Sequence, residues 1–145
     1  MKITILDKQP DEEDEITVKC GTLDENIVKL LNSFKSGKEK MAFYKDEKII
    51  LAEQEEVFYF ESVEDRVFAY TKDCVYETKE KLYQLEQELS PHDFMRANKA
   101  VILNLNKVES LSPAFGGRFE AVLKNDCKII ISRMYVSRLK EMLGL

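Results

Sequence analysis

The chain has 145 residues, of which 44% are hydrophobic and 34% are charged, and its formal net charge is −5. This composition is ordinary for a soluble globular protein that is long enough to bury a core, and it predicts one domain with at most a small appendage. No apolar run approaches the roughly 18–20 residues needed to span a bilayer, and the first residues have neither a secretory nor a transit signal. The three cysteines are far apart in sequence, so they form neither a disulfide framework nor a zinc-binding spacing, and a reducing cytoplasm is expected.

The net negative charge hides an uneven distribution. Residues 41–89 carry six Lys/Arg against thirteen Asp/Glu, whereas residues 90–145 carry nine against five. Because salt screens charges beyond about 8–10 Å, the local balance matters more than the total for contact with a polyanion. The basic last third of the chain therefore keeps nucleic-acid binding open, although a bias of this size is only modest support.

The first 40 residues predict two strands and a helix. Residues 1–8 and 15–20 alternate apolar and polar side chains, which is the period of half-buried strands. An apolar stripe then recurs at helical spacing, formed by Ile27, Leu30, Leu31 and Phe34. Gly37 suits the C-terminal cap of that helix. We expect residues 1–40 to form a small ββα appendage with a dimerisation or regulatory role.

Residues 41–145 predict a mainly β body. Short apolar runs recur about every 8–12 residues and are separated by polar turns, a spacing typical of an all-β sandwich or barrel. These turns are expected at 45–47, 63–65, 72–73, 116–117 and 124–126. Two helices interrupt the strands: one over 79–89 with Leu82, Leu85 and Leu89 on one face, and one over 133–143 that begins after Ser132 as its N-cap.

Little in the sequence indicates catalysis. The single histidine, His92, lies beside a helix-ending proline, where an exposed loop residue is more common than a catalytic base. The glycine pair at 116–117 is better explained by a hairpin turn than by a phosphate-binding loop. The many carboxylates of residues 53–65 are typical of a solvated surface. We therefore expect no catalytic residue, no metal site, no cofactor and no small-molecule substrate.

A polar corner interrupts the apolar segment 94–111. Arg96, Asn98 and Lys99 stand between Phe94-Met95 and the run that begins at Val101. Asn and Lys are ordinary turn residues, and they are also suited to contact bases and phosphates. Local sequence does not decide between these two interpretations. Asn104, a few residues later, is better explained as a turn-forming residue than as a contact.

Several motifs in order resemble the LytTR family of bacterial transcription regulators. They are VFYFES at 57–62, AYT at 69–71, a helix with L-x-x-L-E-x-x-L at 82–89, FMRANKAVILNLNKV at 94–108 and ISRMYV at 131–136. The resemblance covers about residues 41–145. It is strongest to the stand-alone members, because the 40 preceding residues are too short for a phosphoacceptor receiver domain. A small membrane protein is a partner implied by that subgroup.

The resemblance implies an elongated stack of small antiparallel sheets that carries its DNA contacts on loops. Such loops enter two successive major grooves and the minor groove between them. By position, Arg66 belongs to the first loop. Arg96, Asn98 and Lys99 belong to the second, and Arg133 with its neighbours Tyr135 and Arg138 to the third.

Two further expectations concern the side chains of the first and third loops. The acidic neighbours Glu64 and Asp65 are expected to pair with Arg66 until DNA displaces them. A shift of one residue in the third loop would exchange Arg133 for Met134. Arg133 is favoured, because a guanidinium bonds a guanine edge bidentately and a thioether does not.

The function expected from the resemblance is that of a sequence-specific, DNA-binding transcriptional regulator in the cytoplasm. A homodimer on promoter direct repeats is expected, since DNA-binding dimers commonly mirror repeated half-sites. The alternative is a protein-interaction module that sequesters a partner. RNA binding is third, because the aromatic residues lie in strand patterns rather than in exposed clusters suited to base stacking.

Overall fold

The computed structural model describes the backbone of residues 2–36, 40–89, 91 and 93–145, and the side chains of these residues except 32–36. The predicted cap at Gly37, the side chain of Phe34 and the whole of His92 lie outside this part. The chain divides into two compact units, residues 1–36 and 37–145, which are described separately. No helix in the described part is long and apolar enough to cross a membrane.

The first unit contains one helix, α1 (Glu25–Ser36). Asp24 caps it, because its Oδ1 accepts a hydrogen bond from the backbone N–H of Ile27 at 2.9 Å. The two strands predicted before this helix are wrong: residues 2–24 form no strand. Their apolar side chains find no core, since Ile3 and Ile5 are 85% and 91% exposed, and two short strands without a third or a helix to pack on are unstable.

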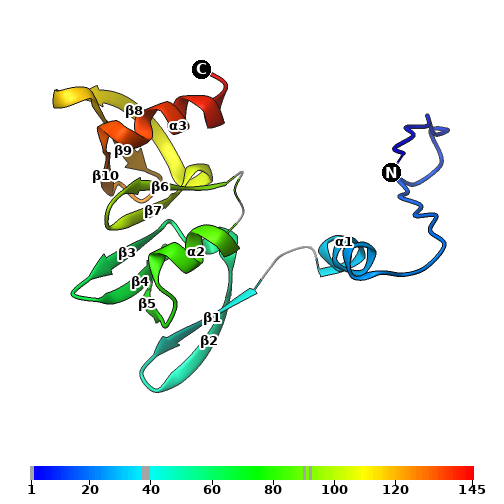
Figure 1. Cartoon of the computed structure of the whole chain (residues 1–145), viewed down its shortest axis with the longest axis horizontal. Coiled ribbons are helices and arrows are strands. Elements are labelled where there is room, and N and C mark those ends of the chain that lie inside the picture. The colour runs from blue at the N-terminus through cyan, green and yellow to red at the C-terminus, as the bar shows by residue number, and fades with distance from the viewer. Residues whose placement is uncertain (1, 37–39, 90, 92) are drawn as a thin grey trace. The chain divides into compact units, whose positions relative to one another are not determined.

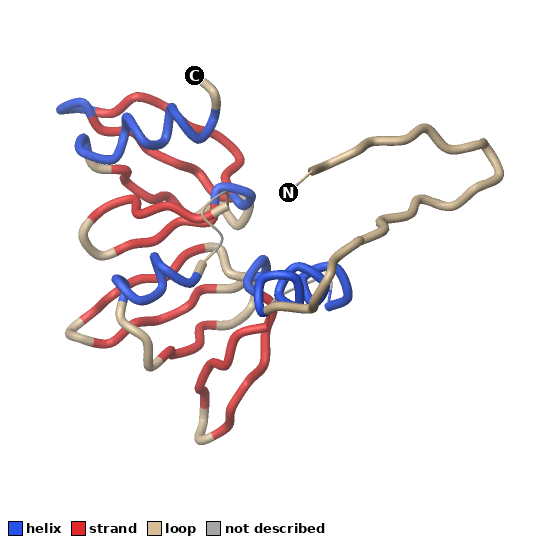
Figure 2. Tube along the Cα trace, turned by 45° about the vertical axis from the view of Figure 1, so that its right-hand side comes forward, coloured by secondary structure: helices blue, strands red, loops and turns tan. Residues whose placement is uncertain are grey.

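The second unit confirms the mainly β prediction, with ten strands among its described residues, arranged in two antiparallel sheets (Figures 1 and 2). The seven-stranded sheet has the order β2-β1-β5-β4-β3-β7-β6. Its strands are β1 (Lys40–Lys45), β2 (Lys48–Glu53), β3 (Tyr59–Val63), β4 (Arg66–Tyr70), β5 (Val75–Thr78), β6 (Phe94–Asn98) and β7 (Val101–Asn104). The three-stranded sheet has the order β10-β9-β8, from β8 (Val108–Ala114), β9 (Arg118–Leu123) and β10 (Lys128–Ile131).

Two α-helices and three short 3-10 turns complete this unit. The helices are α2 (Leu82–Glu88) and α3 (Arg133–Leu143), and the 3-10 turns are η1 (Gln54–Glu56), η2 (Leu105–Lys107) and η3 (Phe115–Gly117). Both helices were predicted. Ser132 does occupy the N-cap of α3, but its side chain makes no capping hydrogen bond.

The tight acidic turns are built from residues with a left-handed backbone. Asp46 and Glu47 join β1 to β2, and Glu64 and Asp65 join β3 to β4, all with φ between 51° and 65°. Positive φ at both central residues matches the twist of the flanking strands and closes a hairpin with two residues. The hairpins predicted at these places are confirmed.

Two buried clusters fill the space on opposite faces of the large sheet. On one face α2 packs Leu85 against Phe43 and Phe60. On the other face, beside β6 and β7, the small sheet and α3 enclose the second cluster, which includes Leu103 and Leu139. All four residues of β7 are buried, because this strand lies between the two clusters.

Asn104, at the end of β7, is a fully buried polar residue. Its Nδ2 donates to the carbonyl of Val57 at 2.8 Å, and its Oδ1 accepts from the backbone N–H of Asn106 at 3.0 Å. The structural role predicted for Asn104 is confirmed.

Candidate nucleic-acid interface

Three bends that are far apart in sequence lie together at one end of the strands. A hydrogen bond of 2.8 Å from the N–H of Ser62 to the carbonyl of Ala100 joins the β3–β4 hairpin to the β6–β7 turn. A second, also 2.8 Å, from the N–H of Ser132 to the carbonyl of Ala97 joins that turn to the start of α3. The three bends follow one another along the left edge of the second unit in Figure 1. The fold thus brings together the three loops that the sequence singled out.

Arg66 begins β4 at the first bend and is paired with Glu77 of β5. Its Nε and Nη2 donate to the two carboxylate oxygens of Glu77 at 2.8 and 2.6 Å. These bonds raise the pKa of Arg66, and they lower the pKa of Glu77. The expected pairing with Glu64 and Asp65 is wrong. The sheet register sets Glu77 opposite Phe68, so that it lies diagonal to Arg66 on the same face, while the two acids occupy the turn.

Arg96 at the second bend is held within the fold. Its Nε donates to the carbonyl of Asn98 at 2.9 Å and its Nη2 to the carbonyl of Lys99 at 2.7 Å. Its Nη1 is ion-paired with Glu86 of α2, and only 20% of the side chain is exposed. The guanidinium therefore holds the backbone of the turn against α2.

Asn98 also bonds inside the protein. Its Oδ1 accepts from the N–H of Ala100 at 2.9 Å, and its Nδ2 donates to the carbonyl of Ile130 in β10 at 2.9 Å. The first bond shapes the turn and the second ties it to the small sheet. Lys99, between these residues, is exposed, and its ammonium makes no hydrogen bond or ion pair with the described residues.

Arg133 is the first residue of α3 and is exposed. No acidic partner for it is found in the part of the chain that the structure describes. Its aliphatic stem lies on the β8–β9 turn, because a Cβ built on Gly117 would be 3.3 Å from both Cγ and Cδ of Arg133. Gly117 also has a φ of +75°, so its lack of a side chain serves both the turn and the packing.

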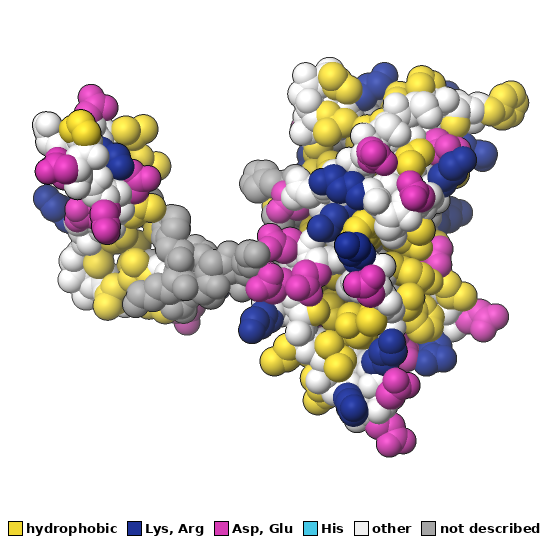
Figure 3. Space-filling model, turned by 180° about the vertical axis from the view of Figure 1, so that it is seen from behind, with side chains coloured by type: hydrophobic (Ala, Val, Ile, Leu, Met, Phe, Trp, Pro, Cys, Tyr) yellow, Lys and Arg dark blue, Asp and Glu magenta, His cyan; other side chains and the backbone are white. Residues whose placement is uncertain are grey.

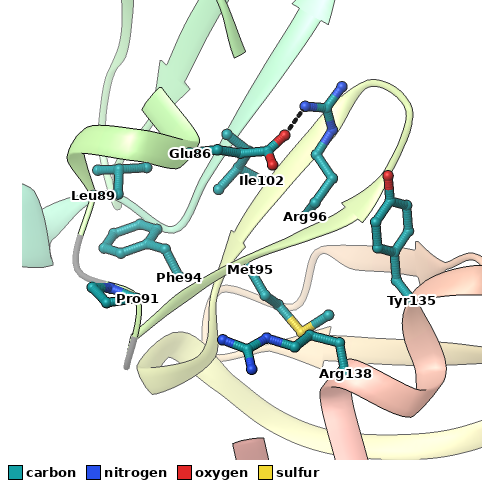
Figure 4. Close-up of a pocket in the computed structure, with 9 residues that line it drawn as sticks. All are labelled: Glu86, Leu89, Pro91, Phe94, Met95, Arg96, Ile102, Tyr135 and Arg138. Atoms are coloured by element: carbon teal, nitrogen blue, oxygen red, sulfur yellow. Dashed lines mark hydrogen bonds and ion pairs between the residues drawn. The ribbon is translucent and has the colours of Figure 1, made fainter. Parts of the chain in front are cut away.

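Tyr135 and Arg138 face a hollow of about 220 Å³ between α2, β6 and α3, which also has Arg96 and Glu86 on its wall. Figure 4 shows Arg96 directed toward Glu86, with Tyr135 and Arg138 projecting from α3 on the other side. Arg138 forms an ion pair of 3.6 Å with Glu141 on the same helix, and half of its side chain is exposed.

The surface charge does not mark this interface by itself. Figure 3 shows lysine, arginine and acidic side chains interspersed over the visible face of the second unit. Among the described residues, no three His, Cys, Asp or Glu side chains are grouped to hold a metal. Lys99 and Arg133 are exposed at the bends, but exposed cations such as Lys124 also lie at the other end of the strands.

The sequence indicated the candidate cations but not the residues that hold them. Glu77 and Glu86 are paired to arginines across strands and from a helix, and Gly117 supports Arg133 from another hairpin. No spacing in the sequence indicates these long-range partners. Of these partners, only Gly117 was marked in the sequence, because it belongs to a glycine pair in a predicted turn.

Comparison with known proteins shows the family to which the second unit belongs. The model of the family described as LytTr DNA-binding domain matches residues 47–144. In the solved structures, the chain is similar to the LytTr DNA-binding domain of a putative methyl-accepting/DNA response regulator from Bacillus cereus. The TM-score is 0.71 at 21% identity, over 75% of this chain and 100% of that one, which shows the same fold.

The chain is also similar to curated full-length proteins. It is 26% identical over 140 residues to the sensory transduction protein LytT of Bacillus subtilis, covering 95% of this chain and 58% of that protein. It is 33% identical over 101 residues to LytT of Enterococcus faecalis, covering 69% of this chain and 41% of that protein. It is 28% identical over 102 residues to the transcriptional regulatory protein YpdB of Escherichia coli K12, covering 70% of this chain and 42% of that protein. The chain thus spans about half the length of these relatives.

Proposed function

We propose that this chain, which belongs to the LytTr DNA-binding domain family, is a transcriptional regulator that binds double-stranded DNA at specific sequences. The names of similar proteins, the sensory transduction protein LytT and the transcriptional regulatory protein YpdB, support this role. The proposal extends to the way the DNA is read: the three bends contact the duplex, with the outer two in successive major grooves and the middle one at the minor groove between them.

The proposal depends most on the surroundings of Arg133. Its guanidinium is exposed, it has no acidic partner in the described part of the chain, and its stem is supported by Gly117. A supported guanidinium can donate two hydrogen bonds to the O6 and N7 of guanine, the commonest base-specific contact in the major groove. We assign Arg133 the role of base reader.

The remaining candidates have different roles in this proposal. Lys99 contacts a phosphate at the middle bend, and Arg66 exchanges Glu77 for DNA at the first. Arg96 and Asn98 hold the middle bend in shape, because their polar atoms already bond within the fold. Tyr135 and Arg138 flank the third bend, where a half-exposed guanidinium suits phosphate contact.

Selection of an operator from random duplex DNA, followed by gel shifts with variants, tests this function. Arg133→Ala is expected to weaken binding by about 1–3 kcal/mol and to relax the preference at one base pair. Lys99→Ala should weaken binding to all duplexes similarly, since a phosphate contact carries no sequence information. Lys124→Ala, in the β9–β10 turn at the other end of the strands, is the matched control and should bind normally. Failure to enrich any sequence, or equal binding by Arg133→Ala, would refute this assignment.

A homodimer on repeated half-sites is part of the proposal. Each copy occupies two successive major grooves, so two copies on one face of the duplex require half-sites about two helical turns apart, near 21 bp. The selected operators should then contain a direct repeat at that spacing, and inserting about 5 bp between the repeats should abolish cooperative binding.

A further inference from the structure

The β8–β9 turn presents a phenylalanine to solvent. Phe115 is 94% exposed, and no large apolar side chain among the described residues is more exposed. An aromatic side chain in water forgoes the stabilisation that burial would give it. Of the nearby residues, Ala114 is half-buried and Phe119 packs on the second buried cluster.

The backbone of this turn is shaped by two glycines. Ala114 pairs with Arg118 across the hairpin, which leaves Phe115, Gly116 and Gly117 as the connecting residues. Gly116 and Gly117 have φ of +78° and +75°, a conformation that other residues seldom adopt. The hairpin therefore ends in a defined turn that carries one large side chain.

This turn continues the row of DNA-contacting bends. Gly117 lies against the stem of Arg133, which begins the third bend. Figures 1 and 2 both show the end of the β8–β9 hairpin beside the start of α3. Arg118, exposed on the next residue of the hairpin, adds a cation at the same place.

From these observations we infer a fourth DNA contact: the ring of Phe115 packs against the 5-methyl group of a thymine next to the base pair read by Arg133. The inference rests on the proposed DNA-binding function. In the major groove, the thymine methyl is the apolar group that base edges offer, and phenylalanine is suited to contact it. Because Gly117 of the same turn lies against the stem of Arg133, we assign Phe115 and Arg133 to adjacent positions of one groove.

A cycle of protein and DNA changes tests the contact. Each thymidine of the selected operator is replaced in turn by deoxyuridine, which lacks only the methyl group, and affinity is measured by fluorescence anisotropy. At one position beside the Arg133 site, the wild type should bind deoxyuridine about fourfold more weakly, the effect of one buried methyl group. Phe115→Ala should bind the thymidine operator several-fold more weakly and should not respond to deoxyuridine at that position.

Met134→Ala is the matched control, because Met134 is another exposed apolar side chain, 73% exposed, at the same bend. It should keep the response to deoxyuridine. Loss of the response in Met134→Ala, or an undiminished response in Phe115→Ala, overturns the inference. Wild-type affinity of Phe115→Ala together with weak binding by Arg133→Ala would overturn it while the proposed function stands, whereas no specific binding by the wild type would remove both.

Discussion

At the residue scale, Glu77 competes with DNA for Arg66. The carboxylate makes two hydrogen bonds to the guanidinium on the surface of the domain. Glu77→Gln removes the negative charge and weakens the pairing, so that Arg66 is more available to a phosphate or base. We expect affinity for duplex DNA to rise about two- to fivefold at low salt, in the range of surface ion pairs.

This increase is measured by anisotropy titration against the selected operator. Glu109→Gln, at the start of β8 and at the other end of the strands, changes the net charge equally and serves as the control. If both variants gain affinity equally, the net charge and not the release of Arg66 would account for the effect.

The variant Arg96→Met distinguishes a supporting role of Arg96 from a direct contact between Arg96 and DNA. Arg96→Met keeps the aliphatic stem but removes the bonds to the carbonyls of Asn98 and Lys99 and the ion pair with Glu86. Loss of these partly buried charge-assisted bonds should lower the free energy of unfolding by about 1–3 kcal/mol in urea denaturation. DNA affinity should fall as well, because Lys99 is no longer held. Normal stability with lost DNA binding would instead mean that Arg96 touches DNA.

Residue types in the sequence were enough to find the candidate cations, but not their partners. Arg66 and Lys99 were visible as cations at predicted bends. Whether each is exposed, paired or held depends on strand register and on helix packing, as the pairs Arg66–Glu77 and Arg96–Glu86 show. Such contacts join elements whose relative position is decided by the whole core. Sequence periodicity does not contain that information.

At the element scale, the predicted strands formed where they could add to a sheet with a buried face. The apolar runs on either side of the turn at 45–47 became the β1–β2 hairpin, since Phe43 and Ala52 enter the core under α2. The alternation at residues 2–8 formed no strand, because nothing in the described first unit buries its apolar face. A local pattern forms a strand only where it has a packing partner.

Glu80, which precedes α2, and Glu88, its last residue, form a pair of acids that makes stability depend on pH. Oε2 of Glu80 is buried without a donor among the described residues. A hydrogen bond shared with Glu88, together with burial, raises the pKa of Glu80 from 4.5 to about 7. The folded state therefore favours the protonated carboxyl more than the unfolded chain does, and this stabilisation is lost as the pH rises from about 5 through 7.

Melting temperatures measured between pH 5 and 8 should consequently fall across that window. Glu80→Gln keeps a neutral hydrogen-bonding side chain at all these pH values, so its melting temperature should change less and should exceed that of the wild type at pH 8. Glu109→Gln should retain the wild-type dependence. An equal pH profile for Glu80→Gln and the wild type would show that this carboxyl is not the titrating group.

At the scale of the whole molecule, a chain of net charge −5 must bind a polyanion through few cations. The acidic first two thirds repel phosphates, while the bends present Arg66, Lys99, Arg133 and Arg138. We expect the logarithm of affinity to fall with the logarithm of salt concentration with a slope equivalent to about 4–6 neutralised phosphates per protomer. Affinity measured from low to physiological salt gives this slope, and no decline with added salt would rule out the phosphate contacts.

In the proposed function, DNA is bound along the one end of the strands where the three bends meet. An NMR titration of the isotopically labelled chain with its selected operator tests it most directly, because each backbone amide reports separately. The largest shifts are predicted at Glu64–Arg66, Asn98–Ala100 and Ser132–Met134, with little change at Thr71–Cys74, Leu105–Lys107 and Lys124–Asp126 at the other end. Shifts concentrated in the second group, with the first group unchanged, would mean that DNA does not bind at the three bends.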